Sequence, residues 1–169
     1  MAKILVIDDE RSIRNSMKDI LSFEGHEVSI AENGLEGLVA VKTNKPEVVF
    51  CDIKMPKMEG IEVLERIKEI APETSVVMIS GHGTIDTAIE AIKKGAYDFI
   101  EKPLDLNRIL ITIKNATDKS QLLQEQQTLK TKVSKKYEMI GSSAALNHIR
   151  EMIGKVAVSD ARVLITGPN

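Results

Sequence analysis

The sequence predicts an α/β protein with a doubly wound, five-stranded parallel sheet. Five short apolar runs alternate along the chain with five stretches whose apolar residues recur at helical spacing. The runs are nearly continuous rather than alternating, which is typical of strands covered by helices on both faces. Charged or hydroxyl residues follow four of the runs, where parallel sheets place their functional sites. Right-handed crossovers and a sheet of this size favour the strand order 2-1-3-4-5.

The elements follow in order from the N-terminus. Helices are expected to end at Gly25, before Pro46, before Pro72 and at Gly95, because glycine favours a helix end and proline does not continue a helix. A fifth helix is expected to begin near Asp105. The predicted strands cover residues 3–7, 27–31, 48–51, 75–79 and 97–100.

The spacing of apolar residues also indicates which residues share a helix face. Leu35 and Val39 belong to the apolar pattern of the second helix, and Ile85 and Ile89 share one face of the fourth. In the fifth helix we expect Leu106 to point inward.

Composition excludes several classes of protein. The 169 residues carry a net charge of −2, so there is no general attraction to nucleic acid or to an anionic membrane. Cys51 is the single cysteine, which excludes an internal disulfide or a cysteine metal cluster. His26, His82 and His148 have no partners at metal-ligand spacing, and we expect them to be structural or exposed. With no signal peptide or membrane-spanning window, a cytoplasmic protein is expected.

Three segments are predicted along the chain. Residues 1–117 form the α/β domain. Residues 118–136 lack glycine and proline and have a loose heptad spacing, so they predict either a helical linker that pairs with a second copy or a solvated, partly disordered connection. Residues 137–169 contain an amphipathic helix capped by Ser143 and a strand-like run over residues 162–166. One helix and one strand do not bury a core, so this segment is expected to be the truncated start of a second domain.

The acidic residues at the ends of the first and third strands indicate phosphoryl chemistry. Asp8, Asp9 and Asp52 are expected to converge where those strands lie side by side, and their mutual repulsion calls for a cation. Mg²⁺ suits such a set of oxygens beside a phosphate, with Asp9 and Asp52 as direct ligands, Asp8 through water and a backbone carbonyl beyond Asp52 as a further ligand. A carboxylate oxygen of Asp52 then attacks phosphorus and forms an acyl phosphate.

Two more strand ends add groups that bind phosphoryl oxygens. Lys102 follows the fifth strand and offers an ammonium, and Ser80 ends the fourth strand and offers a hydroxyl. Either residue alone is ordinary on a protein surface. Together with Asp52 they make the set of groups expected of a phosphoryl-transfer site.

These residues resemble the receiver domain of bacterial two-component response regulators, which has a flavodoxin/CheY-like fold. The resemblance covers residues 3–117. The matching positions are the acidic pair Asp8-Asp9, the phosphoacceptor Asp52, the loop residues Met55-Pro56 and Gly60, the hydroxyl Ser80, the aromatic Phe99 and the dipeptide Lys102-Pro103.

The resemblance implies a phosphorelay function. Asp52 would take a phosphoryl group from a phosphohistidine of a sensor histidine kinase, and Mg²⁺ would be bound by Asp9, Asp52 and the backbone carbonyl of Lys54, with Asp8 assisting. Ser80 and Phe99 would then move and repack the face formed by the fourth strand, the fourth helix and the fifth strand.

The segments 80–84 and 95–103 resemble the NtrC-like group of sigma-54-dependent transcriptional activators, above all its NtrX-type members. Residues 140–142 and 163–167 resemble the entry to that group's AAA+ ATPase domain, with an incomplete phosphate-binding loop. We therefore expect no enzyme activity from these residues beyond self-phosphorylation and autodephosphorylation. Contacts with sigma-54 RNA polymerase and DNA would belong to a longer parent protein, and a homodimer would form through the receiver and the linker helix.

Two other functions use a similar sheet. A small-molecule phosphatase or phosphotransferase with an aspartyl-phosphate intermediate remains the alternative, although the second acid of an Asp-x-Asp pair is replaced by Lys54. A flavodoxin-like cofactor binder is rejected, because Asp8 and Asp9 stand where it needs a phosphate-binding loop and would repel the cofactor phosphate.

Overall fold

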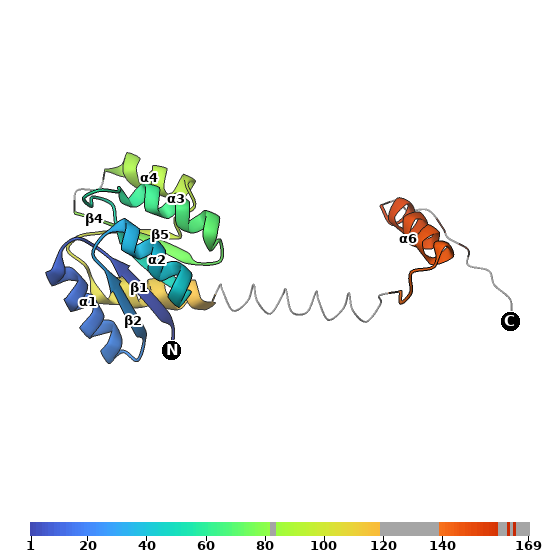
Figure 1. Ribbon diagram of the computed structural model, residues 1–169. Coiled ribbons are helices and arrows are strands. Elements are labelled where there is room, and N and C mark those ends of the chain that lie inside the picture. Colours follow the sequence, from blue (N-terminus) through green and yellow to red (C-terminus); the bar gives the residue numbers. More distant parts are fainter. Residues whose placement is uncertain (82–83, 119–138, 159–161, 163, 165–169) are drawn as a thin grey trace. The chain divides into compact units, whose positions relative to one another are not determined.

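The computed structural model describes residues 1–81, 84–118, 139–158, 162 and 164 (Figure 1). The chain divides into two compact units, residues 1–125 and 126–169. We describe each unit separately.

The first unit is built on a five-stranded parallel sheet with the order β2-β1-β3-β4-β5. This confirms the predicted topology, and each observed strand agrees with its predicted range to within one residue. The strands are β1 (Lys3–Ile7), β2 (Glu27–Ala31), β3 (Val48–Asp52), β4 (Ser75–Ser80) and β5 (Asp98–Glu101).

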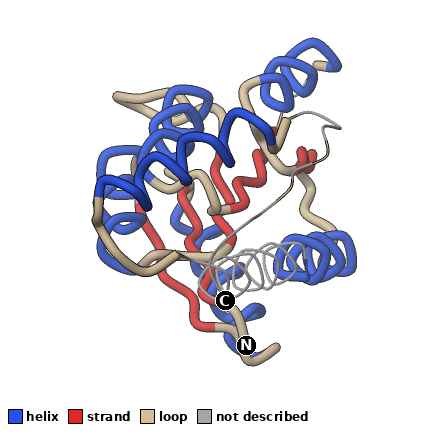
Figure 2. Tube along the Cα trace, turned by 90° about the vertical axis from the view of Figure 1, so that its right-hand side faces the viewer, coloured by secondary structure: helices blue, strands red, loops and turns tan. Residues whose placement is uncertain are grey.

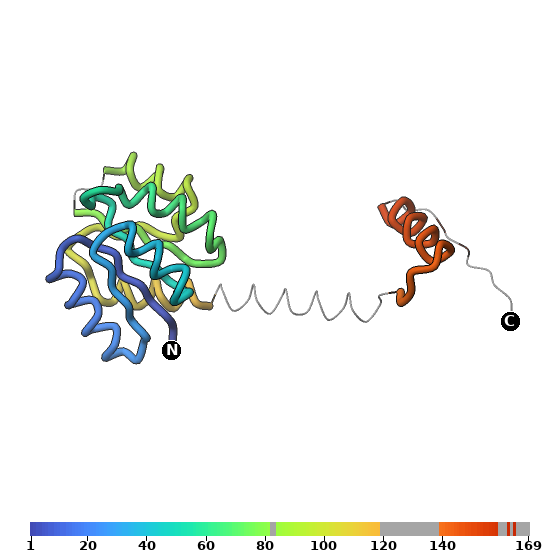
Figure 3. The backbone as a smooth tube through the Cα atoms, viewed as in Figure 1, coloured from blue at the N-terminus to red at the C-terminus, as the bar shows by residue number. Residues whose placement is uncertain are grey.

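Helices cover both faces of this sheet (Figure 2). The chain alternates between strand and helix as it runs from blue to yellow (Figures 1 and 3). One face packs against α1 (Arg11–Phe23) and a helix over residues 106–118. The other face packs against α2 (Gly34–Asn44), α3 (Gly60–Ile70) and α4 (Ile85–Lys93).

The core lies in two layers because successive side chains of a strand point to opposite faces. In β1, Leu5 and Ile7 contribute to the layer under α2 and α3, whereas Ile4 and Val6 contribute to the layer under α1. All four side chains are buried, which explains why the strand reads as a continuous apolar run.

The inward face of α2 differs from the apolar pattern of its sequence. Leu35 and Val39 are 52% and 65% exposed, and the buried residues are Gly34, Gly37 and Val41. A Cβ at position 37 would lie 2.4 Å from Cδ1 of Ile7, so the glycine allows the helix backbone to approach β1 closely.

Apolar side chains of two other helices are also exposed. Ile85 and Ile89 of α4 are 80% and 47% exposed, and Ala91 is the residue of this helix that is buried. Leu106 is 39% exposed, so the expectation that it points inward was wrong; Ile109 and Ile113 carry the contact of that helix with the sheet.

In the second unit the structure describes one helix, α6 (Ala144–Val156). The expected cap is present, since Oγ of Ser143 accepts a hydrogen bond from the backbone N–H of Leu146 at 3.3 Å. Within the predicted strand over residues 162–166, the two described residues have no regular structure. The predicted linker, residues 118–136, lies outside the described residues except for Asp118. Of the described helices, none has the length and apolar character needed to cross a membrane.

Candidate functional site

The ends of β1, β3 and β5 bring three charged side chains into contact. Asp8 follows β1, Asp52 ends β3 and Lys102 follows β5. The Lys102 Nζ atom lies 3.1 Å from Oδ2 of Asp8 and 3.1 Å from Oδ1 of Asp52. The strand order places β1 beside β3, so the two carboxylates are neighbours, and the lysine reaches them across the end of β4.

Asp52 is held from the backbone that follows it. Its side chain is buried, and Oδ2 accepts a hydrogen bond from the backbone N–H of Lys54 at 3.0 Å. The loop then returns to the strand end, where the N–H of Gly60 donates to the carbonyl of Ile53 at 2.8 Å. A Cβ at position 60 would lie 2.0 Å from the carbonyl oxygen of Asp52, so this close return requires glycine.

Asp8 is fully buried and fixed by the start of α1. Its Oδ1 accepts a hydrogen bond from the backbone N–H of Glu10 at 2.8 Å. Its Oδ2 faces Lys102 but receives no hydrogen bond from any described residue. The buried Arg14 donates from Nη1 to the carbonyl oxygens of Asp8 and Asp9, at 2.7 and 2.8 Å. These bonds position the segment between β1 and α1.

Burial dominates the electrostatics of the two carboxylates. It raises the pKa of Asp8 and the pKa of Asp52 above the ordinary value, and the repulsion between the two groups adds to the increase at Asp52. The Lys102 ammonium opposes the shift at both. For Lys102, burial lowers the pKa, but the carboxylates of Glu10, Asp52 and Asp8 outweigh this effect and leave the pKa raised. The site therefore holds a protonated lysine beside two carboxylates whose pKa values are raised by burial.

The third acid around Lys102 is Glu10, which was not expected from the sequence. Its Oε1 accepts a hydrogen bond from Nζ of Lys102 at 3.0 Å. Asp9, which was expected to converge with Asp8 and Asp52, is exposed. In the part of the chain that the structure describes, no three histidine, cysteine or acidic side chains are grouped to hold a metal ion. Among the described side chains, an ammonium rather than Asp9 joins Asp8 and Asp52, and the role of Asp9 as a metal ligand stays a prediction.

The donor chemistry at this site still fits Mg²⁺. Oδ2 of Asp8 is a buried carboxylate oxygen that receives no hydrogen bond from the described residues. Oδ1 of Asp52 forms an ion pair with the ammonium of a lysine side chain. Asp9, the next residue after Asp8 in the chain, is exposed. Hard oxygen ligands of this kind suit a small divalent ion that keeps some of its water.

The response regulator receiver domain family matches residues 4–114. The chain belongs to the response regulator receiver domain family. Its residues 4–114 include the strand ends that carry Asp8, Asp52, Ser80 and Lys102.

The relatives of this receiver domain are regulators of the NtrX and NtrC type, as the sequence motifs predicted. It is 37% identical over 168 residues to the nitrogen assimilation regulatory protein NtrX of Azorhizobium caulinodans, covering 98% of this chain and 37% of that protein. The crystal structure of NtrX from Brucella abortus superposes with a TM-score of 0.72 at 42% identity, covering 99% of this chain and 37% of that one. The chain therefore spans little more than a third of the length of these relatives.

A third similar structure is the solution structure of the beryllofluoride-activated NtrC4 receiver domain dimer. It has a TM-score of 0.68 and 42% identity, covering 71% of this chain and 99% of that one. That structure is a receiver domain alone, so this likeness concerns the receiver part of the chain.

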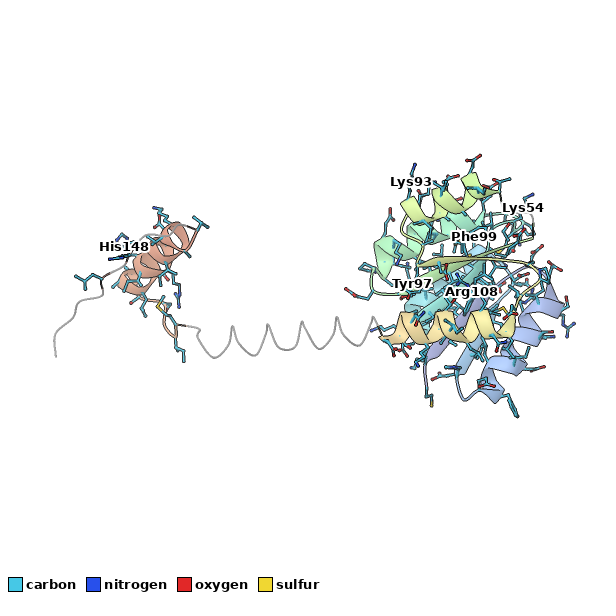
Figure 4. The ribbon with its side chains drawn as sticks, turned by 180° about the vertical axis from the view of Figure 1, so that it is seen from behind. Lys54, Lys93, Tyr97, Phe99, Arg108 and His148 are labelled. Atoms are coloured by element: carbon cyan, nitrogen blue, oxygen red, sulfur yellow. The ribbon has the colours of Figure 1, made fainter. Side chains whose placement is uncertain are left out.

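The two predicted switch residues of the receiver lie on β4 and β5. Ser80 is buried at the end of β4, and its carbonyl oxygen accepts a hydrogen bond from the backbone N–H of Lys102 at 2.8 Å. Phe99 is half-buried on β5 (Figure 4), where it packs against the core layer under α2, α3 and α4. The Arg108 guanidinium pairs with Asp98 at 2.7 Å and ties this helix to β5. The edge strand with Phe99 is therefore connected to the helix that leads out of the receiver.

Cys51 and two of the histidines, His26 and His148, are among the described residues. Burial raises the pKa of the Cys51 thiol, which is fully buried, so it behaves as a small core residue. His26 accepts a hydrogen bond from the backbone N–H of Ala2 at 3.3 Å, and burial lowers its pKa. His148 is exposed on α6 (Figure 4), and His82 is outside the described residues.

Proposed function

We propose that this receiver domain accepts a phosphoryl group on Asp52 from a phosphohistidine of a sensor histidine kinase. The observation that carries the proposal is the buried Asp52 carboxylate held 3.1 Å from the Lys102 ammonium at the carboxyl edge of the sheet. In this reaction an oxygen of Asp52 forms a bond to phosphorus while the bond between phosphorus and the histidine nitrogen breaks, and the imidazole leaves with the electron pair. The product is an acyl phosphate.

Each neighbouring group has a part in this transfer. Lys102 binds a phosphoryl oxygen, and the hydroxyl of Ser80 donates to another. Asp9, Asp52 and the backbone carbonyl of Lys54 hold Mg²⁺, with Asp8 assisting. When bound, the ion supplies positive charge that offsets the charge on the phosphoryl oxygens.

The new charge on Asp52 then changes the output of the protein. Ser80 and Phe99 move toward the site and alter the packing of β4, α4 and β5, which shifts an equilibrium between two arrangements. The similarity to the NtrC4 receiver dimer supports a homodimer as part of this output. We propose residues 1–117 as the receiver domain, residues 118–136 as the helical linker of that dimer, and residues 137–169 as the start of an AAA+ domain.

The wider function follows from the relatives. In the longer protein, the receiver controls a sigma-54-dependent activator that contacts RNA polymerase and DNA in the cytoplasm. The alternative, a phosphatase for small molecules, is not favoured, because the relatives found are regulators and position 54 holds a lysine instead of the second acid.

Acetyl phosphate tests the acceptor function without the kinase. With Mg²⁺, the chain is expected to gain one hydroxylamine-labile phosphoryl group per molecule, measured by intact mass spectrometry. Asp52→Asn is expected to abolish the gain, because an amide cannot form the acyl phosphate. Undiminished labelling of the variant would remove Asp52 as the acceptor.

A further inference from the structure

Glu10 makes a long-range contact that its place in the fold does not require. It is the residue before α1, where a side chain commonly accepts a hydrogen bond from the first turn. Glu10 makes no such capping bond. Its carboxylate instead accepts a hydrogen bond from Lys102, 92 positions further along the chain. The Glu10 side chain thus contacts the lysine of the phosphoryl site and does not cap its own helix.

Three carboxylate oxygens surround the Lys102 ammonium. They belong to Asp8, Glu10 and Asp52 and lie 3.0 to 3.1 Å from Nζ. Nζ donates a hydrogen bond to Oε1 of Glu10, whereas Oδ2 of Asp8 receives none from the described residues. A phosphoryl oxygen that binds Lys102 therefore competes with Glu10 for the N–H groups of the ammonium.

Glu10 is the partner that can be released at the smallest cost. The side chains of Asp8 and Asp52 are 0% and 6% exposed, and each is also held by a backbone N–H. The Glu10 side chain is 56% exposed, so its carboxylate can turn into water and be solvated there. Ion pairs of such exposed groups are weak and exchange readily.

We propose that Glu10 is a positioning residue that holds Lys102 in the unphosphorylated receiver and releases it to the phosphoryl group on Asp52. This inference rests on the proposed function of Asp52. In the reaction with acetyl phosphate, an Asp52 oxygen bonds to phosphorus, the bond from phosphorus to the acetate oxygen breaks, and acetate leaves with the electron pair. Glu10 competes with the phosphoryl oxygens for Lys102 throughout this step and thereby slows it.

Two substitutions separate the contact from the charge. Glu10→Gln keeps the shape but offers Lys102 only a neutral acceptor. Glu10→Asp keeps the negative charge but shortens the side chain by one methylene, so its carboxylate withdraws from Lys102. Glu69→Gln, an exposed position near the C-terminal end of α3, is the control for the loss of one surface charge.

The first measurement is the rate of phosphoryl gain from acetyl phosphate with Mg²⁺, followed by intact mass spectrometry. Glu10→Gln and Glu10→Asp are each expected to load roughly two- to fivefold faster, the range set by the strength of an exposed ion pair, and Glu69→Gln at the parent rate. A parent rate for Glu10→Gln would overturn the proposal. A parent rate for Glu10→Asp alone would also overturn it, since charge without contact would then explain the effect.

The second measurement needs neither metal nor phosphoryl donor. The ¹⁵N-detected ammonium signal of Lys102, assigned by its loss in Lys102→Arg, is expected in the parent chain, because a held ammonium exchanges its protons slowly. The signal is expected to broaden in both Glu10 variants and to persist in Glu69→Gln. An unchanged signal in the Glu10 variants would contradict the proposal that Glu10 holds the Lys102 ammonium in place.

Asp52→Asn distinguishes a failure of the proposed acceptor function from a failure of the proposed Glu10 role. If Asp52→Asn still gains the phosphoryl group, the proposed function fails. If Asp52→Asn is unlabelled while the Glu10 variants load at the parent rate, the role of Glu10 alone fails.

Discussion

Gly60→Ala is expected to disturb phosphoryl loading without touching a charged group. The added Cβ would lie 2.0 Å from the carbonyl oxygen of Asp52 and 2.8 Å from Cα of Ile53, and both are backbone atoms that cannot rotate away. Since Cβ atoms essentially never approach closer than 3.0 Å, the loop after β3 must move by at least about 1 Å.

The size of the effect follows from this displacement. Overpacking at a rigid contact lowers the free energy of unfolding by about 1–3 kcal/mol. A shift of about 1 Å in a reacting group lowers a rate by up to roughly 100-fold. We therefore expect loading from acetyl phosphate to fall about ten- to 100-fold, because the Asp52 carboxylate and the carbonyl of Lys54 both lie on the displaced backbone.

Intact mass spectrometry measures the loading rate, and urea unfolding measures the stability. Gly154→Ala is the matched control, because an added methyl there meets no atom within 4 Å. Parent-like loading and stability in Gly60→Ala would refute the reasoning that the close return of this loop positions Asp52.

Three further predictions concern charge and assembly. Burial raises the pKa of Asp8 and Asp52 in the folded receiver, so folding takes up protons; this stabilisation is complete below the ordinary carboxyl pKa of about 4 and is lost as the pH rises through the folded values. Without Mg²⁺, the free energy of unfolding of the parent relative to Asp52→Asn is thus expected to fall in urea titrations as the pH rises above the ordinary carboxyl pKa of about 4, and a constant difference would contradict the shift at Asp52. Lys102→Met is expected to lower the free energy of unfolding by about 1–3 kcal/mol at pH 7.5, because two buried carboxylates lose their counter-charge, whereas an unchanged urea midpoint would show that the ammonium does not stabilise them. In sedimentation equilibrium, the phosphorylated full chain is expected to differ in dimer content from residues 1–117 alone. An equal dimer content in both would exclude residues 118–169 from the dimer.

The sheet and the meeting of its strand ends could be predicted because both depend on periodicity along the chain. Runs such as residues 48–51 are continuous because both faces of the strand are buried. Once the order 2-1-3-4-5 is accepted, parallel strands bring Asp8, Asp52 and Lys102 to one edge, whatever the details of packing.

The remaining features depend on side-chain reach and close packing, which periodicity does not encode. Glu10 continues the acidic run after β1, but its contact with Lys102 depends on a rotamer that turns away from the helix. Gly37 is inward-facing because it has no side chain, so an apolar pattern overlooks it and selects the exposed Leu35 instead. Asp9 follows Asp8 in sequence, yet Asp8 is buried and Asp9 is exposed, a difference that the acidic run does not encode.

The central claim is that Asp52 carries the phosphoryl group. The most direct test is to load the chain with acetyl phosphate and Mg²⁺, reduce it with borohydride and map the product by peptide mass spectrometry. Borohydride reduces an aspartyl phosphate to homoserine, so the account predicts homoserine at position 52 and unmodified aspartate at positions 8 and 9. Homoserine at position 8 or 9 with intact Asp52, or phosphoryl gain without any homoserine, would contradict it.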